Sequence, residues 1–274
     1  FKIVNAPPKF GVFLLVLSGN FVLLFKGTIM FKIFTYLLVF GFFLFACSPN
    51  NVKSDPAIVK IMDSASVTGV FALIENGSGQ FTISNLAAYK DSAYAPLNTF
   101  FAIPTMIALD KGYISHDSTT WVSLDSVNFY EGLISKIGRE AMVKTRDSLQ
   151  YGKGIMTADS TKYWSNSSLL ITPDEQLGLI KKLYFNALPF QKRSQDMYKK
   201  MILKEDNANY KLSYINGLDT AKGKSWFLGY VEENKHPYFF VFYTQSVKST
   251  PVINDHGALL KTILLQQGFL KGVR

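Results

Sequence analysis

Residues that could bind a metal or act as reactive thiols are sparse in this 274-residue chain. It has one cysteine, Cys47, and three histidines, His116, His236 and His256, all far apart in the sequence. A structural zinc site needs four suitably spaced nitrogen or sulfur ligands, and a disulfide framework needs paired cysteines. The spacing therefore predicts neither, and we expect no metal and no cofactor. We expect the isolated His256 to lie at the surface.

Hydroxyl groups are common, and a serine or threonine attacks a carbonyl when a base takes its proton. On a helix, residues i and i+3 lie on the same face, so a lysine three positions after the hydroxyl is within hydrogen-bond reach. No serine or threonine of this chain is followed by lysine at that spacing. The sequence therefore offers hydroxyl nucleophiles without the lysine base of this arrangement.

Strand-like segments stand on both sides of the middle of the chain. Val67–Ile74 is rich in β-branched and aromatic residues, and the polar turn Asn76–Gly79 leads into the alternating Gln80–Ser84, which predicts a β-hairpin. Three further runs near the C-terminus have strand character, and the last two are joined by polar residues 233–236. These runs are Tyr210–Ile215, Trp226–Glu232 and Pro237–Thr244.

Between and after these strands the apolar residues have helical spacing. Asn98 or Thr99 could cap a helix over Phe101–Leu109, and Thr172–Asn186 begins with a capping threonine and a proline in its first turn. Strands at both ends with helices between them predict an α+β domain whose N- and C-terminal strands share an antiparallel sheet. The remaining predicted helices are Ser126–Gly138 and His256–Leu270.

The N-terminal residues differ in composition from the rest. Residues 1–46 hold 11 of the 23 phenylalanines, four lysines and no acidic residue. Without them, 25 basic and 20 acidic side chains remain, and the net charge falls from +9 to +5. Nucleic-acid binding needs a more concentrated basic face, so we expect no nucleic-acid partner.

An apolar run at Ile33–Ala46 follows Met30 and one lysine and ends in Leu-Phe-Ala-Cys. Its length suits a signal-peptide core better than a membrane span of about 20 residues. The ending resembles the lipobox of bacterial lipoproteins, which implies a lipid on Cys47. We therefore expect export to the cell envelope and a membrane anchor facing the periplasm or the outside. The alternative is an ordinary thiol at Cys47 behind a membrane anchor.

This interpretation divides the chain into four parts, and the first apolar run has two explanations. It is either sequence upstream of the true start at Met30 or a first membrane span over residues 10–25. The predicted parts are an upstream or membrane segment at 1–29, a lipoprotein signal peptide at 30–46, a tether at 47–56 and a folded domain at 57–274.

Four strings stand in an order and spacing that carries a family resemblance. They are PLNTFFAIPTMIAL at 96–109, YGKGIMTADSTKYWSNSSLLITPDEQLGLIKKLYFN at 151–186, YKLSYINGL at 210–218 and SWFLGYVEENKHPYFFVFYT at 225–244. Together they resemble the class D β-lactamases and the related penicillin-recognising sensor domains over residues 65–270. The resemblance implies a transpeptidase-like fold, with a helical region inserted into an antiparallel sheet. It also implies a β-lactam or a peptidoglycan peptide as ligand.

In that family a serine at the start of a buried helix attacks the β-lactam, and a lysine one turn later, often carbamylated, is the general base. A second serine moves the proton, and a Lys-Thr-Gly triplet on the edge strand binds the substrate carboxylate. An amide nitrogen is not a useful nucleophile, and a phenyl ring cannot take a proton. The corresponding positions of this chain hold Asn98, Phe101, Asp125 and the triplet Ile215, Asn216 and Gly217, of which only the glycine matches.

Neighbouring residues do not restore the chemistry. Thr99 is one helix step, about 100°, away from the serine position, and a shift of one residue at Asp125 would offer only Ser126. The resemblance implies that Trp164 shields the family lysine, and here we expect it to pack against Phe101 in a collapsed or repurposed cleft. The sequence thus predicts a pseudoenzyme acting as a binding or structural module. The alternatives are an active serine β-lactamase with an unrecognised nucleophile and a decaying gene without a present role.

Overall fold

The computed structural model of the chain divides into two units, residues 1–50 and 51–274, which are described separately. In the first unit, β1 (Val12–Leu17) and β2 (Phe21–Lys26) pair as an antiparallel hairpin. Cys47 and the signal peptide predicted at residues 30–46 lie outside the described residues. Among the helices that are described, none is long and apolar enough to cross a membrane. The described residues are 12–17, 21–26, 51–115, 127–154, 164–165, 168–247 and 255–274.

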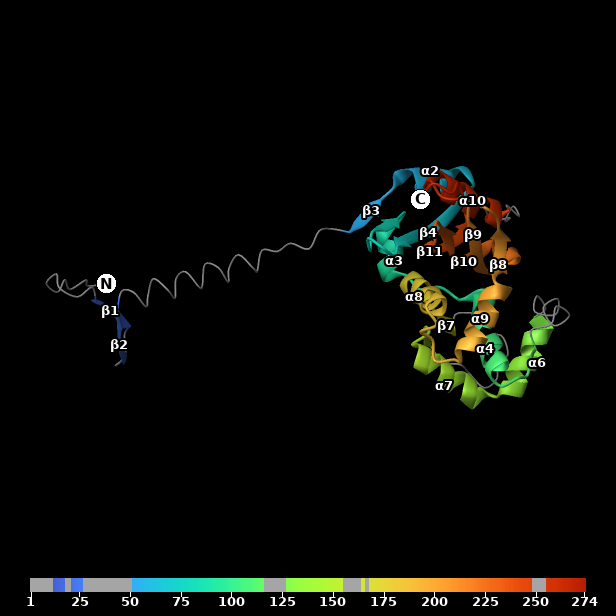
Figure 1. The fold of residues 1–274 in the computed structure, drawn as a ribbon, viewed down its shortest axis with the longest axis horizontal. Coiled ribbons are helices and arrows are strands. Elements are labelled where there is room, and N and C mark those ends of the chain that lie inside the picture. Colours follow the sequence, from blue (N-terminus) through green and yellow to red (C-terminus); the bar gives the residue numbers. More distant parts are fainter. Residues whose placement is uncertain are drawn as a thin grey trace. The chain divides into compact units, whose positions relative to one another are not determined.

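The second unit is built on a seven-stranded sheet with the order β3-β5-β4-β11-β10-β9-β8 (Figure 1). The short β3 runs parallel to β5, and every other neighbouring pair is antiparallel. Because β4 pairs with β11 over its whole length, strands from both ends of the domain share one sheet, as predicted. The strands are β3 (Val52–Ser54), β4 (Val67–Glu75), β5 (Phe81–Ile83), β8 (Leu203–Asp206), β9 (Lys211–Asp219), β10 (Lys224–Glu233) and β11 (His236–Ser246).

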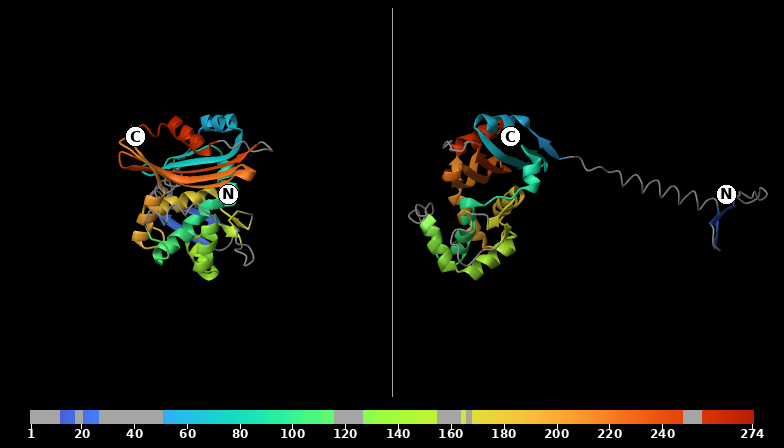
Figure 2. Two further views of the ribbon diagram at one scale, coloured as in Figure 1. Left: turned by 90° about the vertical axis from the view of Figure 1, so that its right-hand side faces the viewer. Right: turned by 180° about the vertical axis from the view of Figure 1, so that it is seen from behind.

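Helices cover both faces of this sheet, as the left view of Figure 2 shows. The helices α2 (Pro56–Ser64) and α10 (His256–Gln266) pack on one face, and the helical region inserted between β5 and β8 packs on the other. The central strands are therefore buried on both sides and read as continuous apolar runs. The inserted elements are α3 (Leu86–Asp91), η1 (Leu97–Phe101), α4 (Ala102–Asp110), α6 (Val127–Ile137), α7 (Arg139–Leu149), the two-stranded β6 (Lys153–Gly154) and β7 (Leu169–Leu170), α8 (Pro173–Tyr184) and α9 (Lys192–Met201).

Local signals fix the start of α8. The Thr172 hydroxyl accepts from the Glu175 backbone N–H, and the Glu175 carboxylate accepts from the Thr172 backbone N–H, which makes a complete capping box. Pro173 occupies the first turn. The helix predicted over Thr172–Asn186 is confirmed, and so are the β4–β5 hairpin and the three C-terminal strands.

The prediction that Asn98 or Thr99 caps the buried helix is wrong. A 3₁₀ turn, η1, precedes α4, and neither Asn98 nor Thr99 caps α4; its N-cap is Phe101, whose side chain makes no capping bond. All residues of α4 from Ala102 to Leu109 are buried, so packing on every side positions this helix.

Two further expectations change at the edges of the domain. Residues 47–56 were expected as a tether, but Val52–Ser54 forms β3 and pairs with β5, because a three-residue strand can complete a sheet edge without a long apolar run. His256 is not simply at the surface: it is half-buried, and its Nδ1 lies 3.1 Å from Ser225 Oγ and 3.0 Å from Thr244 Oγ1. The side chain of the neighbouring Asp255 caps α10 instead.

Candidate binding cleft

A cleft of about 380 Å³ lies where η1, α6, α9, the edge strand β8 and its neighbour β9 meet. Its volume is within the range of small-molecule sites, about 300–1,000 Å³. Most of its lining residues are aromatic or aliphatic, joined by two asparagines and one lysine, but the surface exposed to the cleft is more polar than apolar. The lining residues are Asn98, Phe101, Tyr130, Tyr198, Met201, Ile202, Lys204, Tyr214, Ile215, Asn216 and Leu218.

The register of the last two strands opens this cleft. Pairing between β8 and β9 ends at Leu203 and Ser213, and the Tyr214 backbone N–H then donates to the Ile202 carbonyl at 3.0 Å. From Ile215 onward, β9 has no strand partner on its outer side among the described residues. Tyr214 and Ile215 point to opposite faces of the sheet, yet both line the cleft, so the cleft follows the free edge of β9.

Gly217 brings the strand and the buried helix together. A Cβ at this position would lie 2.8 Å from the Thr99 backbone N and 2.9 Å from the Asn98 backbone N. Only glycine therefore allows β9 to approach the first turn of η1 so closely. This contact sets Asn98 beside Asn216, so the serine and triplet positions of the family resemblance meet at one wall.

Phe101 is packed inside an aromatic cluster. Its ring stacks on Tyr130 with centroids 3.8 Å apart and 12° between the planes. Trp164 meets it edge to face at 5.2 Å and stacks on Phe100 at 5.9 Å. Phe101 is 6% exposed and Trp164 1%. The expected contact between Trp164 and Phe101 is present, but these rings do not fill the cleft, and Trp164 lies behind its wall.

The Thr99 hydroxyl is engaged elsewhere. It donates to the Pro96 carbonyl and accepts a hydrogen bond from Gln176 Nε2 at 2.8 Å. The Tyr151 hydroxyl donates to Gln176 Oε1 at 3.4 Å. All three side chains are buried, and burial raises the pKa of the Tyr151 hydroxyl well above its ordinary value. Thr99 thus belongs to an internal network, and it does not line the cleft.

Lys204 is the one charged side chain lining the cleft in the described part of the chain. Its Nζ lies 5.4 Å from the centroid of the Tyr214 ring, in the geometry of a cation–π contact. Burial raises the pKa values of Tyr198 and Tyr214, so both phenols stay protonated at neutral pH. Lys204 escaped the sequence analysis because its strand, β8, is only four residues long and mostly exposed.

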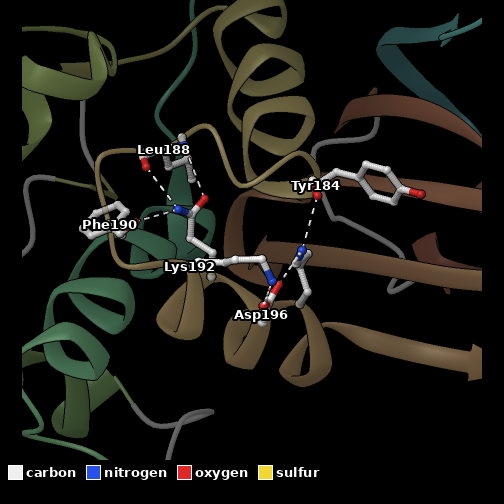
Figure 3. A network of polar contacts seen from close by, with 7 residues as sticks. Tyr184, Leu188, Phe190, Lys192 and Asp196 are labelled. Carbon is white, nitrogen blue, oxygen red and sulfur yellow. Dashed lines mark hydrogen bonds and ion pairs between the residues drawn. The ribbon is translucent and has the colours of Figure 1, made fainter.

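The position of α9 depends on bonds to the loop before it (Figure 3). The buried Gln195 side chain donates to the carbonyls of Leu188 at 3.1 Å and Phe190 at 2.8 Å, and accepts from the Leu188 backbone N–H at 3.3 Å. Asp196 pairs with Lys192 at 2.6 Å. These bonds fix the first half of α9, whose second half carries two cleft residues.

Asp125, the remaining predicted site position, lies outside the described residues, as does Ser126. The structure therefore places five of the seven predicted positions in the cleft wall or in backbone contact with it, and a sixth, Trp164, behind Phe101. The structure adds Tyr130 of α6, Tyr198 of α9 and Lys204 of β8 to the residues that line the cleft. These come from segments whose own sequences carry no motif.

The fold and the order of elements define the class: an α+β domain of the transpeptidase-like type, with its cleft between the buried helix and the sheet edge. No family model matches the sequence. The chain is 24% identical to the β-lactamase OXA-5 of Pseudomonas aeruginosa over 261 residues, which covers 86% of this chain and 97% of that protein.

Two solved structures share the fold. The C-terminal domain of the Bacillus licheniformis BlaR penicillin-receptor aligns with a TM-score of 0.68 and 24% identity, covering 79% of this chain and 96% of that domain. FUS-1 (OXA-85), a class D β-lactamase from Fusobacterium nucleatum subsp. polymorphum, aligns with a TM-score of 0.70 and 19% identity, covering 80% and 100%. The resemblance to class D β-lactamases and penicillin-receptor domains is thereby confirmed, as is the fold class.

Proposed function

We propose that this chain is a penicillin-recognising domain that has lost acyl transfer and binds its ligand without forming a covalent bond. Phe101 carries the proposal. Its ring stacks on Tyr130 and meets Trp164 edge to face, at the position where the family resemblance expects the lysine base. A phenyl ring takes up no proton, and the space around it is closed by other rings.

The hydroxyl groups of the cleft support the same conclusion. Among the described residues, no serine or threonine lines it, and its only hydroxyls belong to tyrosines. The Tyr130 hydroxyl lies 3.0 Å from the Thr105 hydroxyl. Tyr198 and Tyr214 have raised pKa values because they are buried, which lowers the population of a nucleophilic phenolate. Loss of a nucleophile and its base together removes several orders of magnitude in rate.

Labelling with a fluorescent penicillin tests this proposal. We expect no fluorescent band on a denaturing gel, because no acyl-enzyme forms, while a class D β-lactamase treated in parallel is labelled. Turnover of a chromogenic cephalosporin should equal that of buffer. A band that disappears with excess unlabelled penicillin, or turnover abolished by substituting one hydroxyl residue, would overturn the proposal in favour of an active serine β-lactamase.

The same proposal includes a lipid anchor at Cys47 and a place in the cell envelope. It rests on the lipobox-like ending before Cys47 and on the polar residues that follow it. Intact-mass measurement of the protein from bacterial membranes should give a chain that begins at Cys47 and carries lipid. The variant Cys47→Ala should retain its signal peptide and lack the lipid mass. A mature protein that begins at another, unmodified residue would contradict the anchor.

A further inference from the structure

Two asparagine–glycine pairs of the chain lie in contrasting places. Asn76 and Gly77 are in the turn between β4 and β5, and Asn216 and Gly217 lie inside β9. Asparagine is a thermolabile residue, and a glycine after it makes it more so. The backbone nitrogen of the glycine can attack the side-chain amide carbon, because glycine has no Cβ to obstruct the approach. The local structure then decides whether the reaction takes place.

The turn leaves the Gly77 backbone free to react. Gly77 is exposed, and neither its N–H nor the Asn76 side chain makes a hydrogen bond to the described part of the chain. The bonds that close the turn lie on either side: the Gly79 N–H donates to the Glu75 carbonyl at 2.8 Å, and the Glu75 N–H donates to the Gln80 carbonyl at 2.9 Å. A Cβ on Gly77 would meet no atom within 4 Å. The nitrogen can therefore approach the Asn76 side chain without losing a bond or pressing on a neighbour.

The pair in β9 is held by the sheet. Gly217 lies opposite Trp226 in the antiparallel ladder with β10. Backbone N–H groups alternate in direction along a strand, and since the Tyr214 N–H donates to Ile202 on the outer side, the Gly217 N–H points to β10. One face of Gly217 is also closed by η1, where a Cβ would lie 2.8 Å from the Thr99 backbone N. Ring closure at Asn216 would therefore require the sheet to open.

We propose that Asn76 is a site of spontaneous deamidation in the folded protein and that Asn216 is protected. The Gly77 nitrogen forms a bond to Asn76 Cγ, and its proton and the side-chain amino group leave together as ammonia. Water then opens the resulting succinimide ring. Attack at one ring carbonyl gives aspartate, and attack at the other gives isoaspartate, in which the chain continues through the side-chain carbon. Water is the one co-reactant, and no oxidation state changes.

The products would act on the edge of the sheet. A new carboxylate would stand next to Glu75, whose Oε1 accepts from Arg274 Nη1 at 3.0 Å. Isoaspartate would also add a backbone carbon inside the turn. This turn positions Asn51, because Asn51 Nδ2 donates to the Gly79 carbonyl at 2.9 Å and the Asn51 carbonyl accepts from the Phe81 N–H at 2.7 Å. Isoaspartate formation should therefore loosen the edge strand β3, which begins next to Asn51 and pairs with β5.

Peptide mass analysis of the folded protein, incubated at mildly alkaline pH, tests the site. The peptide with Asn76 should gain one mass unit and separate into aspartate and isoaspartate forms, while the peptide with Asn216 stays unchanged. In concentrated urea both peptides should react. Gly77→Ala should slow the gain about tenfold, which corresponds to about 1.4 kcal/mol in the activation free energy. It is a matched control, because the added methyl group meets no atom in the folded protein.

Equal rates at Asn76 and Asn216 in the folded protein, no gain at Asn76, or an unchanged rate in Gly77→Ala would overturn the assignment. Amide hydrogen exchange on the converted sample measures the consequence. The Phe81 amide should exchange faster than before conversion, and the amide of Phe240, in the central strand β11, should not. Unchanged exchange at Phe81 would overturn the effect on β3. None of these measurements involves a β-lactam, so the proposed function stands or fails separately.

Discussion

The first turns of α8 and of the η1–α4 segment are held in opposite ways. At α8, the Thr172 and Glu175 side chains bond to backbone groups, and Pro173 presets the first turn. At η1 and α4, neither N-cap makes a side-chain capping bond, and the segment is held by burial and by contact with Gly217. The comparison teaches that positions 98 and 101 are not needed for helix initiation. Their side chains can change chemistry while the fold persists, provided that the packing is kept.

The largest effect should come from restoring an amine at the packed position. Phe101→Lys should lower the free energy of unfolding by about 4 kcal/mol, because it leaves a buried charge without a partner among aromatic rings. Urea unfolding would measure it, with Phe101→Leu as the matched control at a loss below about 1.5 kcal/mol. Equal losses for lysine and leucine would show that the cluster still accommodates a base.

The contact between β9 and η1 should be the next most sensitive. Gly217→Ala should cost about 2 kcal/mol, since its Cβ would press on the backbone nitrogens of Thr99 and Asn98. The control is Gly178→Ala in α8, where a Cβ meets no atom within 4 Å. That change should stabilise by about 0.5–1 kcal/mol, because glycine is a poor helix residue. Thermal unfolding should show a lower melting temperature for Gly217→Ala and a higher one for Gly178→Ala. A shift in the same direction for both variants would contradict the close contact between β9 and η1.

A pair of alanine substitutions tests the comparison most directly. Thr172→Ala removes the cap of α8 and should cost about 1 kcal/mol. Asn98→Ala removes no capping bond and should change the free energy of unfolding by less than about 0.5 kcal/mol. Chemical denaturation of the two variants side by side decides it. If Asn98→Ala proved the more costly, the first turn of η1 would depend on that side chain after all.

The smallest effect is a pH dependence on the other face of the sheet. Burial lowers the pKa of His256, so the unfolded chain, with an ordinary pKa of about 6.5, takes up the proton first. The free energy of unfolding should therefore fall as the pH drops below that value and stay unchanged above it.

The variant His256→Gln should lose this part of the pH dependence. His236→Gln, at an exposed position of β11, serves as the control and should keep it. Stability curves at about pH 7 and pH 5 provide the measurement. If the free energy of unfolding changed equally with pH in both variants, His256 would make no contribution to the pH dependence.

Much of the fold follows from local pattern. The β4–β5 hairpin, α6, α8 and the three C-terminal strands have periodicity, turns or caps that specify them, and the structure agrees to within a few residues. Most of the elements that were not anticipated are short or mostly polar, with the apolar-faced helix α2 as an exception. The segments β3 and β8 are strands because of their neighbours, and α9 is a strongly polar helix held by its bonds to the preceding loop.

The residues of the site also fall into two groups, those that the sequence locates and those that only the structure reveals. The family resemblance locates Asn98, Phe101 and Ile215 in one cleft because their strings have a fixed order. The aromatic wall and Lys204 come from segments without such strings, and they converge only through the end of β8–β9 pairing and the placement of α9. Convergence of this kind depends on tertiary geometry, so no local spacing predicts it.

The central claim is that the cleft no longer forms an acyl-enzyme, and intact-mass spectrometry after prolonged incubation with benzylpenicillin tests it most directly. The account predicts a protein mass identical to that of the untreated sample, including under conditions in which a class D β-lactamase control shows its adduct. A mass increase equal to one benzylpenicillin, mapped by peptide analysis to a residue of the cleft, would contradict it.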